Sequence, residues 1–436
     1  MTIHVFDDMS RTDVLDHVER AHALKAQAER DVLACARQWA VLHHPDHPDR
    51  CAALSPRSRA NARPAGAEGT PPITEYAASA FAARIRTSPY GARRLIADAV
   101  DLHHRLPRLQ AGIEDGRTSV RCARHVAEAT RELTAEQASW VDTEVVDIAD
   151  GRLAWKRFTG IVKGKVAVAA PELARAKELA AATERGIRLS RVNEHGIGTL
   201  TIRDHITTLL RATAGIEAAA QALAEQAPEL SRTDSRLAAF ATLTNPEAHP
   251  DLAVGPVRAQ VRIDLSLTPD SPIARMDGHG PVTTAWVKDV IAHLGGRVRV
   301  TPVINLAHQA PVDAYEIPAA LRRAVHLIHG GDIFPYAPHT GRAMDTDHNI
   351  PHSEGGATEA GNLGPMTRTH HRIKTHHTED GKEWECRQPF PGIVVWRDPY
   401  GTTYVVDHTG TRKTSPPRAA PGTSDRPGED FRKGAA

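Results

Sequence analysis

The sequence is poor in cysteine, in aromatic residues and in net charge. Its four cysteines, Cys35, Cys51, Cys122 and Cys386, lie far apart and none belongs to a C-x-x-C pair, so no cysteine zinc cluster or disulfide framework is indicated. Aromatic residues make up only 4% of the chain, so a core must be built from Ala, Leu, Val and Ile, which favours helices. The formal net charge of +1 gives the whole chain no attraction to nucleic acid.

Long apolar runs are also missing. No stretch of 18 apolar residues occurs, so we expect no membrane span and no membrane partner. The segment Met1 to His17 is acidic and lacks an apolar core, so it is not expected to be a signal peptide, and the expected compartment is the cytoplasm. A chain of 436 residues with 41% hydrophobic content is long enough for two or three folded domains.

Periodicity and composition predict an α+β chain made of several parts. The expected parts are a largely helical domain over 1–230 with a Pro/Arg-rich loop at 44–72, a linker over 231–256, a small mixed β/α region over 257–312, a C-terminal domain over 313–410, and a disordered tail over 411–436.

Several elements carry specific signals. Helical spacing runs from about Ser10 to Leu42, Ser88-Pro89 is a helix start, and Thr134 with Gln137 fits a capping box. Further helices are expected over 172–185, 204–226, 284–294 and 317–329. Strands are expected over 198–202, 257–267, 298–306, 384–387, 393–397 and 403–407.

One stretch, Arg342 to Thr375, concentrates residues suited to chemistry. It reads R-A-M-D-T-D-H-N-I-P-H-S-E-G-G-A-T-E-A-G-N-L-G-P-M-T-R-T-H-H-R-I-K-T. Thirteen residues separate His348 from Asn362, and eight separate Asn362 from His371. A lone Asp-His pair is common by chance, but the full set with both spacings and a Gly-Gly turn is not.

This stretch resembles the HNH nuclease signature, whose fold is a β-hairpin and a helix around one divalent metal ion. The resemblance implies that His348 is the general base, that Asp347 and His371 are the metal ligands, and that the Asn362 amide ties the loop and orients His348. Phosphodiester hydrolysis needs an activated water and charge neutralisation, and a neutral histidine can take the proton of that water. We therefore expect a metal-dependent endonuclease that uses Mg²⁺, Mn²⁺, Ni²⁺ or Zn²⁺ and acts on DNA, with RNA as the alternative.

Other polar residues lie beside these four. Asp345 would share the strand face of Asp347 and is a candidate partner that orients a metal ligand, or an additional ligand. Arg368, Arg372 and Lys374 flank His371 and are candidate phosphate contacts, with an ordinary solvated helix face as the alternative.

The resemblance extends along the chain, roughly from Arg11 to Asp407. The segments that carry it include S-P-Y-G-A-R-R-L-I-A-D-A, R-C-A-R-H-V-A-E-A-T and R-Q-P-F-P-G-I-V-V-W-R-D-P-Y-G-T-T-Y. They are similar to 13E12-repeat proteins, in which a domain of unknown function (number 222) precedes a C-terminal HNH nuclease domain with the ββα-metal fold. The N-terminal segments carry no evident chemistry, so a helical scaffold is expected there, with DNA binding as the alternative.

One departure from the family concerns structural zinc. Family cysteine positions correspond here to Asp332, Ala337 and Thr367, with His370 in the fourth place, so we expect no structural zinc. Apolar packing is expected to fill the space, from Ile333, Phe334, Tyr336 and Met366. A surrogate site from Asp332, His339 and His370 is the alternative. The loss also leaves open a catalytically decayed nucleic-acid-binding protein that retains the HNH fold, or a protein-interaction scaffold.

Overall fold

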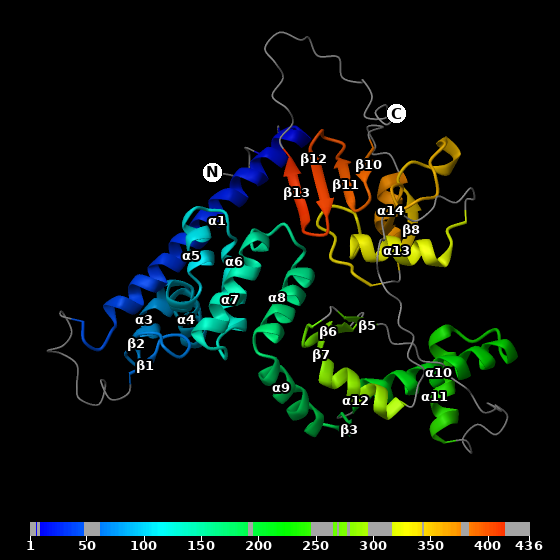
Figure 1. The fold of residues 1–436 in the computed structure, drawn as a ribbon, viewed down its shortest axis with the longest axis horizontal. Coiled ribbons are helices and arrows are strands. Elements are labelled where there is room, and N and C mark those ends of the chain that lie inside the picture. The colour runs from blue at the N-terminus through cyan, green and yellow to red at the C-terminus, as the bar shows by residue number, and fades with distance from the viewer. Residues whose placement is uncertain are drawn as a thin grey trace, which may run out of the picture. The chain divides into compact units, whose positions relative to one another are not determined.

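The computed structural model describes residue 6 and residues 9–47, 62–190, 195–245, 265–267, 270–276, 280–294, 316–341, 344–375 and 383–414. The chain is α+β, as the sequence predicts (Figure 1). It divides into two compact units, Met1–Ala169 together with Thr301–Ala436, and Ala170–Val300. The helical N-terminal part and the C-terminal part with the motif therefore belong to the same unit.

The N-terminal part of the first unit is almost entirely helical. Its elements are α1 (Arg11–Leu42), β1 (Arg63–Pro64), β2 (Pro72–Ile73), α3 (Ala77–Arg84), α4 (Pro89–Arg105), α5 (Pro107–Glu114), α6 (Val120–Ala129), α7 (Ala135–Val145), η1 (Val146–Ile148) and α8 (Trp155–Ala169). The expected helix starts are confirmed: Ser88 accepts a hydrogen bond from the Gly91 N–H, and Thr134 forms a capping box with Gln137. Of the expected loop over 44–72, residues 48–61 lie outside the described residues, and β1 and β2 form a short hairpin in the rest.

Small and branched side chains build the core of these helices, as the scarcity of aromatic residues predicts. Ala92 and Ile96 of α4, Ala123 and Val126 of α6, and Val141 of α7 are fully buried. Among the helices that the structure describes, none is long and apolar enough to cross a membrane.

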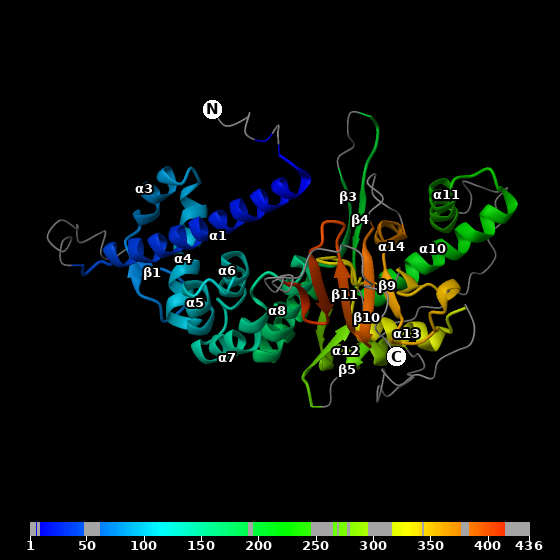
Figure 2. The same cartoon turned by 90° about the horizontal axis from the view of Figure 1, so that it is seen from above.

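The second unit mixes helices with short antiparallel strands. Its elements are α9 (Pro171–Thr183), β3 (Gly186–Leu189), β4 (Leu200–Arg203), α10 (Ile206–Gln226), α11 (Arg232–Thr244), β5 (Leu265–Leu267), β6 (Ile273–Met276), β7 (Gly280–Thr283) and α12 (Thr284–Leu294). Strands β3 and β4 form a hairpin that projects from the rest of the unit (Figure 2).

Helix α11 occupies the first half of the segment 231–256, where the composition indicated a linker. Only Leu265–Leu267 of the long strand expected over 257–267 is described, and the strand expected over 298–306 lies outside the described residues.

The C-terminal part of the first unit contains the motif. Its elements are α13 (Ala319–His329), β8 (Asp345–His348), η3 (His352–Glu354), β9 (Leu363–Met366), α14 (Arg368–Thr375), β10 (Glu385–Phe390), β11 (Ile393–Arg397), β12 (Thr403–Asp407) and β13 (Gly410–Thr414). Strands β8 and β9 form an antiparallel hairpin that α14 follows, and β10 to β13 form a four-stranded antiparallel sheet. The last strand, β13, includes residues 411–414 of the expected disordered tail, and residues 415–436 lie outside the described residues.

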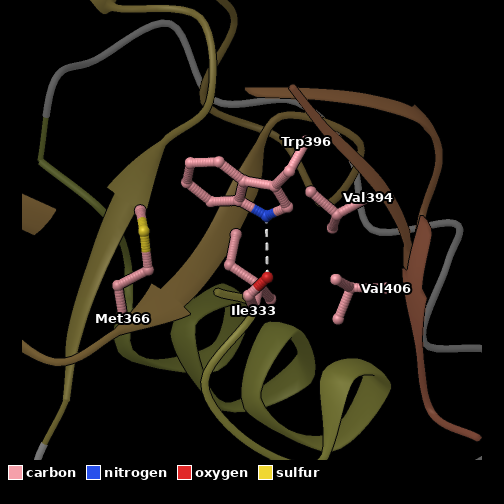
Figure 3. Close-up of a cluster of buried hydrophobic side chains, with 5 residues drawn as sticks. All are labelled: Ile333, Met366, Val394, Trp396 and Val406. Carbon is pink, nitrogen blue, oxygen red and sulfur yellow. Dashed lines mark hydrogen bonds between the residues drawn. The ribbon is translucent and has the colours of Figure 1, made fainter. Parts of the chain in front are cut away.

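A buried cluster fixes the β8–β9 hairpin on this sheet. Met366 of β9 and Ile333 pack against Val394 and Trp396 of β11 and Val406 of β12 (Figure 3). The indole N–H of Trp396 donates a hydrogen bond of 2.8 Å to the carbonyl oxygen of Ile333. Strand β9 of the hairpin therefore rests on a buried apolar core.

Candidate active site at the hairpin and the following helix

Strand β8 and helix α14 bring together a carboxylate, an imidazole and an ammonium group. Asp347 Oδ1 lies 3.5 Å from His371 Nε2, and Lys374 Nζ donates a hydrogen bond of 2.7 Å to Asp347 Oδ2. Lys374 also donates to the carbonyl oxygen of His348. Residues 347 and 371 are thus neighbours in space although a loop and a strand separate them in sequence.

His348, the residue that follows Asp347, is buried at the end of β8. Its Nε2 lies 2.8 Å from the hydroxyl oxygen of Thr358. Burial lowers the pKa of His348 below its usual value of 6.5, although the Asp347 carboxylate opposes this effect. The imidazole is therefore mainly neutral at physiological pH, which is the protonation state that a general base requires.

Asn362 closes the loop between the two strands. Its side-chain oxygen accepts a hydrogen bond of 2.8 Å from the Ile350 N–H, and its amide donates to the carbonyl oxygens of Ile350 (3.0 Å) and Ala357 (2.9 Å). The Asn362 carbonyl oxygen accepts a further bond of 2.7 Å from the Asn349 N–H. One buried amide thus joins both sides of the loop immediately after His348.

The loop closes only because residue 356 is glycine. A Cβ at Gly356 would lie 2.0 Å from the Ile350 carbonyl oxygen and 2.7 Å from Asn362 Nδ2. Gly356→Ala should therefore destabilise this part of the chain by about 1–3 kcal/mol, the usual cost of overpacking, and should displace Asn362. Urea unfolding would measure the change. Gly361→Ala is the matched control, since the nearest atom there is 3.6 Å away; an equal loss in both variants would contradict this account of the loop.

The other candidate residues lie on α14 and at the start of β8. Arg368 and Arg372 are exposed on α14, one turn apart, where they can reach a phosphate. Lys374 is only 10% exposed and binds Asp347, because α14 turns this position toward β8; its expected contact with phosphate stays a prediction. Asp345 is exposed at the start of β8, and its predicted role beside Asp347 stays a prediction.

Asn349, the residue after His348, belongs to a polar network that the sequence does not predict. Asn349 donates to the side-chain oxygen of Gln388 (2.5 Å), and Gln388 donates to the carbonyl oxygen of Ala360 (2.9 Å). Cys386 lies beside Asn349, with its sulfur 3.4 Å from Asn349 Oδ1. These contacts join β10 to both ends of the loop. No signal in the motif indicates Gln388, because β10 comes after it in the chain.

Asp332 and His370 occupy two of the four positions that correspond to zinc ligands in the family. Asp332 Oδ2 accepts hydrogen bonds from His370 Nδ1 (2.6 Å) and from the Thr367 N–H (2.9 Å), and Oδ1 accepts one from the Phe334 N–H (2.9 Å). The Asp332 side chain is completely buried. Burial alone would raise its pKa, but these hydrogen bonds outweigh burial and lower it.

The apolar packing expected at this place is present in part. Ile333 and Met366 are buried, and Phe334 packs on the same cluster and stacks on the His370 ring. Tyr336, which we expected to fill the same space, is instead 49% exposed. Its backbone has a positive φ of 57°, and its N–H donates to Thr411 Oγ1 in β13.

The donor set at Asp347 and His371 fits a divalent cation. Two ligands about 2.1 Å from one ion lie roughly 3 Å apart when adjacent, close to the 3.5 Å seen here. Within the described ranges, no group of three His, Cys, Asp or Glu side chains forms a metal site. The two side chains would therefore share the ion with water and with a ligand such as phosphate.

Comparison with known proteins bears on the N-terminal part of the first unit and on much of the second unit. No curated protein and no solved structure matches the chain. Residues 48–252, which include the described elements from β1 to α11, match the model of the family described as Domain of unknown function (DUF222).

Proposed function

We propose that this protein is a metal-dependent endonuclease of the HNH type that hydrolyses phosphodiester bonds in DNA. The observation that carries the proposal is the pairing of Asp347 with His371 at 3.5 Å; the residue that follows Asp347 in the sequence, His348, has a buried imidazole. A hairpin followed by a helix supplies all three groups, in the order that the HNH resemblance predicts.

Each group has a defined task in this proposal. Asp347 and His371 would hold a divalent ion, which would supply charge neutralisation for the phosphate and the leaving oxygen. His348 accepts a proton from a water molecule, whose oxygen attacks the phosphorus while the bond to the leaving ester oxygen breaks; solvent then protonates that oxygen. Arg368 and Arg372 contact flanking phosphates, which makes DNA binding dependent on salt.

The second candidate function is DNA binding without hydrolysis, as in a decayed nuclease. The contact that favours it is the bond from Lys374 Nζ to Asp347 Oδ2, because an ammonium group already neutralises the carboxylate that should bind the metal. We favour hydrolysis, since Lys374 contacts one carboxylate oxygen and leaves the other facing His371.

Replacing Lys374 tests whether this lysine orients Asp347 for metal binding or hinders metal binding. If Lys374 orients Asp347, Lys374→Met should lower the maximal nicking rate by about 10–100-fold, as for other residues that orient metal ligands. Arg372→Met removes the same charge from an exposed position and should raise KM while sparing the maximal rate. Faster nicking by Lys374→Met, or the same KM effect in both variants, would contradict an orienting role.

The proposed function is tested by separating binding from cleavage. The full-length protein is first mixed with supercoiled plasmid in EDTA, and binding is measured by gel shift at several salt concentrations. An excess of Mg²⁺, Mn²⁺ or Ni²⁺ then starts the reaction. Conversion to nicked or linear plasmid supports the endonuclease, whereas salt-dependent binding with intact plasmid under every metal supports the decayed form. Parallel reactions with RNA determine which nucleic acid is cut.

A further inference from the structure

Thr358 is a buried threonine that contacts the imidazole of His348. It lies in the loop between η3 and β9 and is only 1% exposed. Its Oγ1 lies 2.8 Å from His348 Nε2, a normal hydrogen-bond distance. The motif spacing drew no attention to this residue, because threonine cannot serve as a base at neutral pH.

The contact matters because a neutral imidazole has two different nitrogens. One carries a proton and the other carries the lone pair that can accept one. A histidine acts as a base only when the nitrogen with the lone pair faces the reacting water. The hydrogen-bond partner of the other nitrogen fixes the tautomer, and so fixes which nitrogen carries the lone pair. In this chain Nε2 faces the buried Thr358 hydroxyl.

The same loop contacts also fix Thr358 in place. Asn362 donates a hydrogen bond of 2.9 Å to the carbonyl oxygen of Ala357, the residue that precedes Thr358. Gly356, two residues before Thr358, has no room for a Cβ. The middle residue of the motif is thus joined to the base through Thr358, in addition to its bonds with Ile350.

We propose that Thr358 is a positioning residue: its hydroxyl oxygen accepts a hydrogen bond from His348 Nε2–H, so that the lone pair of Nδ1 is the one that takes the proton from the attacking water. The proposal rests on the proposed nuclease function for its catalytic consequence, but the tautomer itself can be measured without activity. It also gives Asn362 a specific task, which is to hold the loop that presents Thr358.

Two substitutions test the catalytic consequence in the full-length protein. Thr358→Val has nearly the same shape without the hydroxyl group and should lower the maximal rate of plasmid nicking by at least about 10-fold with little change in KM. Thr358→Ser restores the hydroxyl group and should recover the rate to within about 3-fold of wild type. A merely structural role predicts the opposite order, since serine lacks the buried methyl group.

A matched control lies on β8. Thr346 Oγ1 is 3.2 Å from His326 Nε2, so Thr346→Val removes the same kind of threonine–histidine contact away from the base. This variant should nick plasmid at the wild-type rate. If Thr358→Val nicks as fast as Thr346→Val, the proposal is overturned.

The tautomer is read directly by ¹⁵N NMR of histidine-labelled full-length protein, at a pH where His348 is neutral. The His348 signals are assigned by their loss in His348→Ala. Wild type should show the proton on Nε2, and Thr358→Val should populate the other tautomer. A proton on Nδ1 in wild type, or an unchanged tautomer in Thr358→Val, overturns the proposal. If wild type fails to nick any plasmid, the nuclease function fails, but the NMR result still decides the role of Thr358.

Discussion

Replacing His348 by alanine is expected to lower the rate of metal-dependent plasmid nicking by about 10²–10⁴-fold, the range that general base catalysis supplies. The buried imidazole lies next to Asp347 in sequence, and burial lowers its pKa, so wild-type His348 is neutral and able to accept a proton. Alanine removes this proton acceptor but leaves Asp347 and His371 in place. Single-turnover nicking under saturating protein isolates this effect from DNA binding.

His339→Ala provides the control for this substitution. His339 is an exposed histidine of the same part of the chain, with its ring 6.5 Å from that of His370. Its variant should nick at close to the wild-type rate. DNA binding in EDTA should be unchanged in both variants, because neither side chain is among the proposed phosphate contacts. Nicking by His348→Ala at the His339→Ala rate would rule out His348 as the base.

The second large effect concerns Asp332. Asp332→Ala should destabilise the C-terminal part of the chain by about 3–5 kcal/mol, because it removes a buried acceptor from three hydrogen bonds. One donor, the Thr367 N–H, directly precedes α14, so this helix should loosen first. Hydrogen exchange of the α14 amides should become about 10²-fold faster or more.

The pH dependence of this contribution follows from the lowered pKa of Asp332. A carboxylate whose folded pKa lies below the unfolded value of 3.8 stabilises the fold fully above that value. The stabilisation is lost as the pH falls through the folded pKa. Wild type and Asp332→Ala should therefore differ most near neutrality and converge in strong acid.

Asp345→Ala is the comparison for this stability measurement. Asp345 is an exposed aspartate at the start of β8, so its removal should change the free energy of unfolding by less than about 0.5 kcal/mol. Urea unfolding measured by the fluorescence of the six tryptophans, which include Trp396 in the adjacent core, gives the free energy of unfolding. Equal effects of Asp332→Ala and Asp345→Ala would mean that the Asp332 hydrogen bonds do not hold α14.

Local signals account for what the sequence predicted correctly about the fold. Ser88 with Pro89, and Thr134 with Gln137, act within one helical turn, so the helix starts could be found without knowing the tertiary structure. A similar signal was missed at α11, where Ser231 accepts a hydrogen bond from the Asp234 N–H. Strand β13 could not be found this way, because its stability comes from pairing with β12.

Only part of the candidate site could likewise be predicted from the sequence. The spacing of the motif indicated which residues gather around Asp347, and the structure brings His371 to it. The direction of Lys374 could not be predicted, since it depends on how α14 rotates against β8. Thr358 and Gln388 were missed because their roles arise only when the loop and β10 fold onto β8.

The central claim is that Asp347, His348 and His371 form a metal-dependent nuclease site. Its most direct test is the single-turnover rate at which the full-length protein nicks supercoiled plasmid in Mn²⁺, compared with the rate in excess EDTA. We predict nicking in Mn²⁺ and none above background in EDTA. Plasmid that stays supercoiled in Mn²⁺ while bound by the protein, or nicking that proceeds equally in EDTA, would contradict the claim.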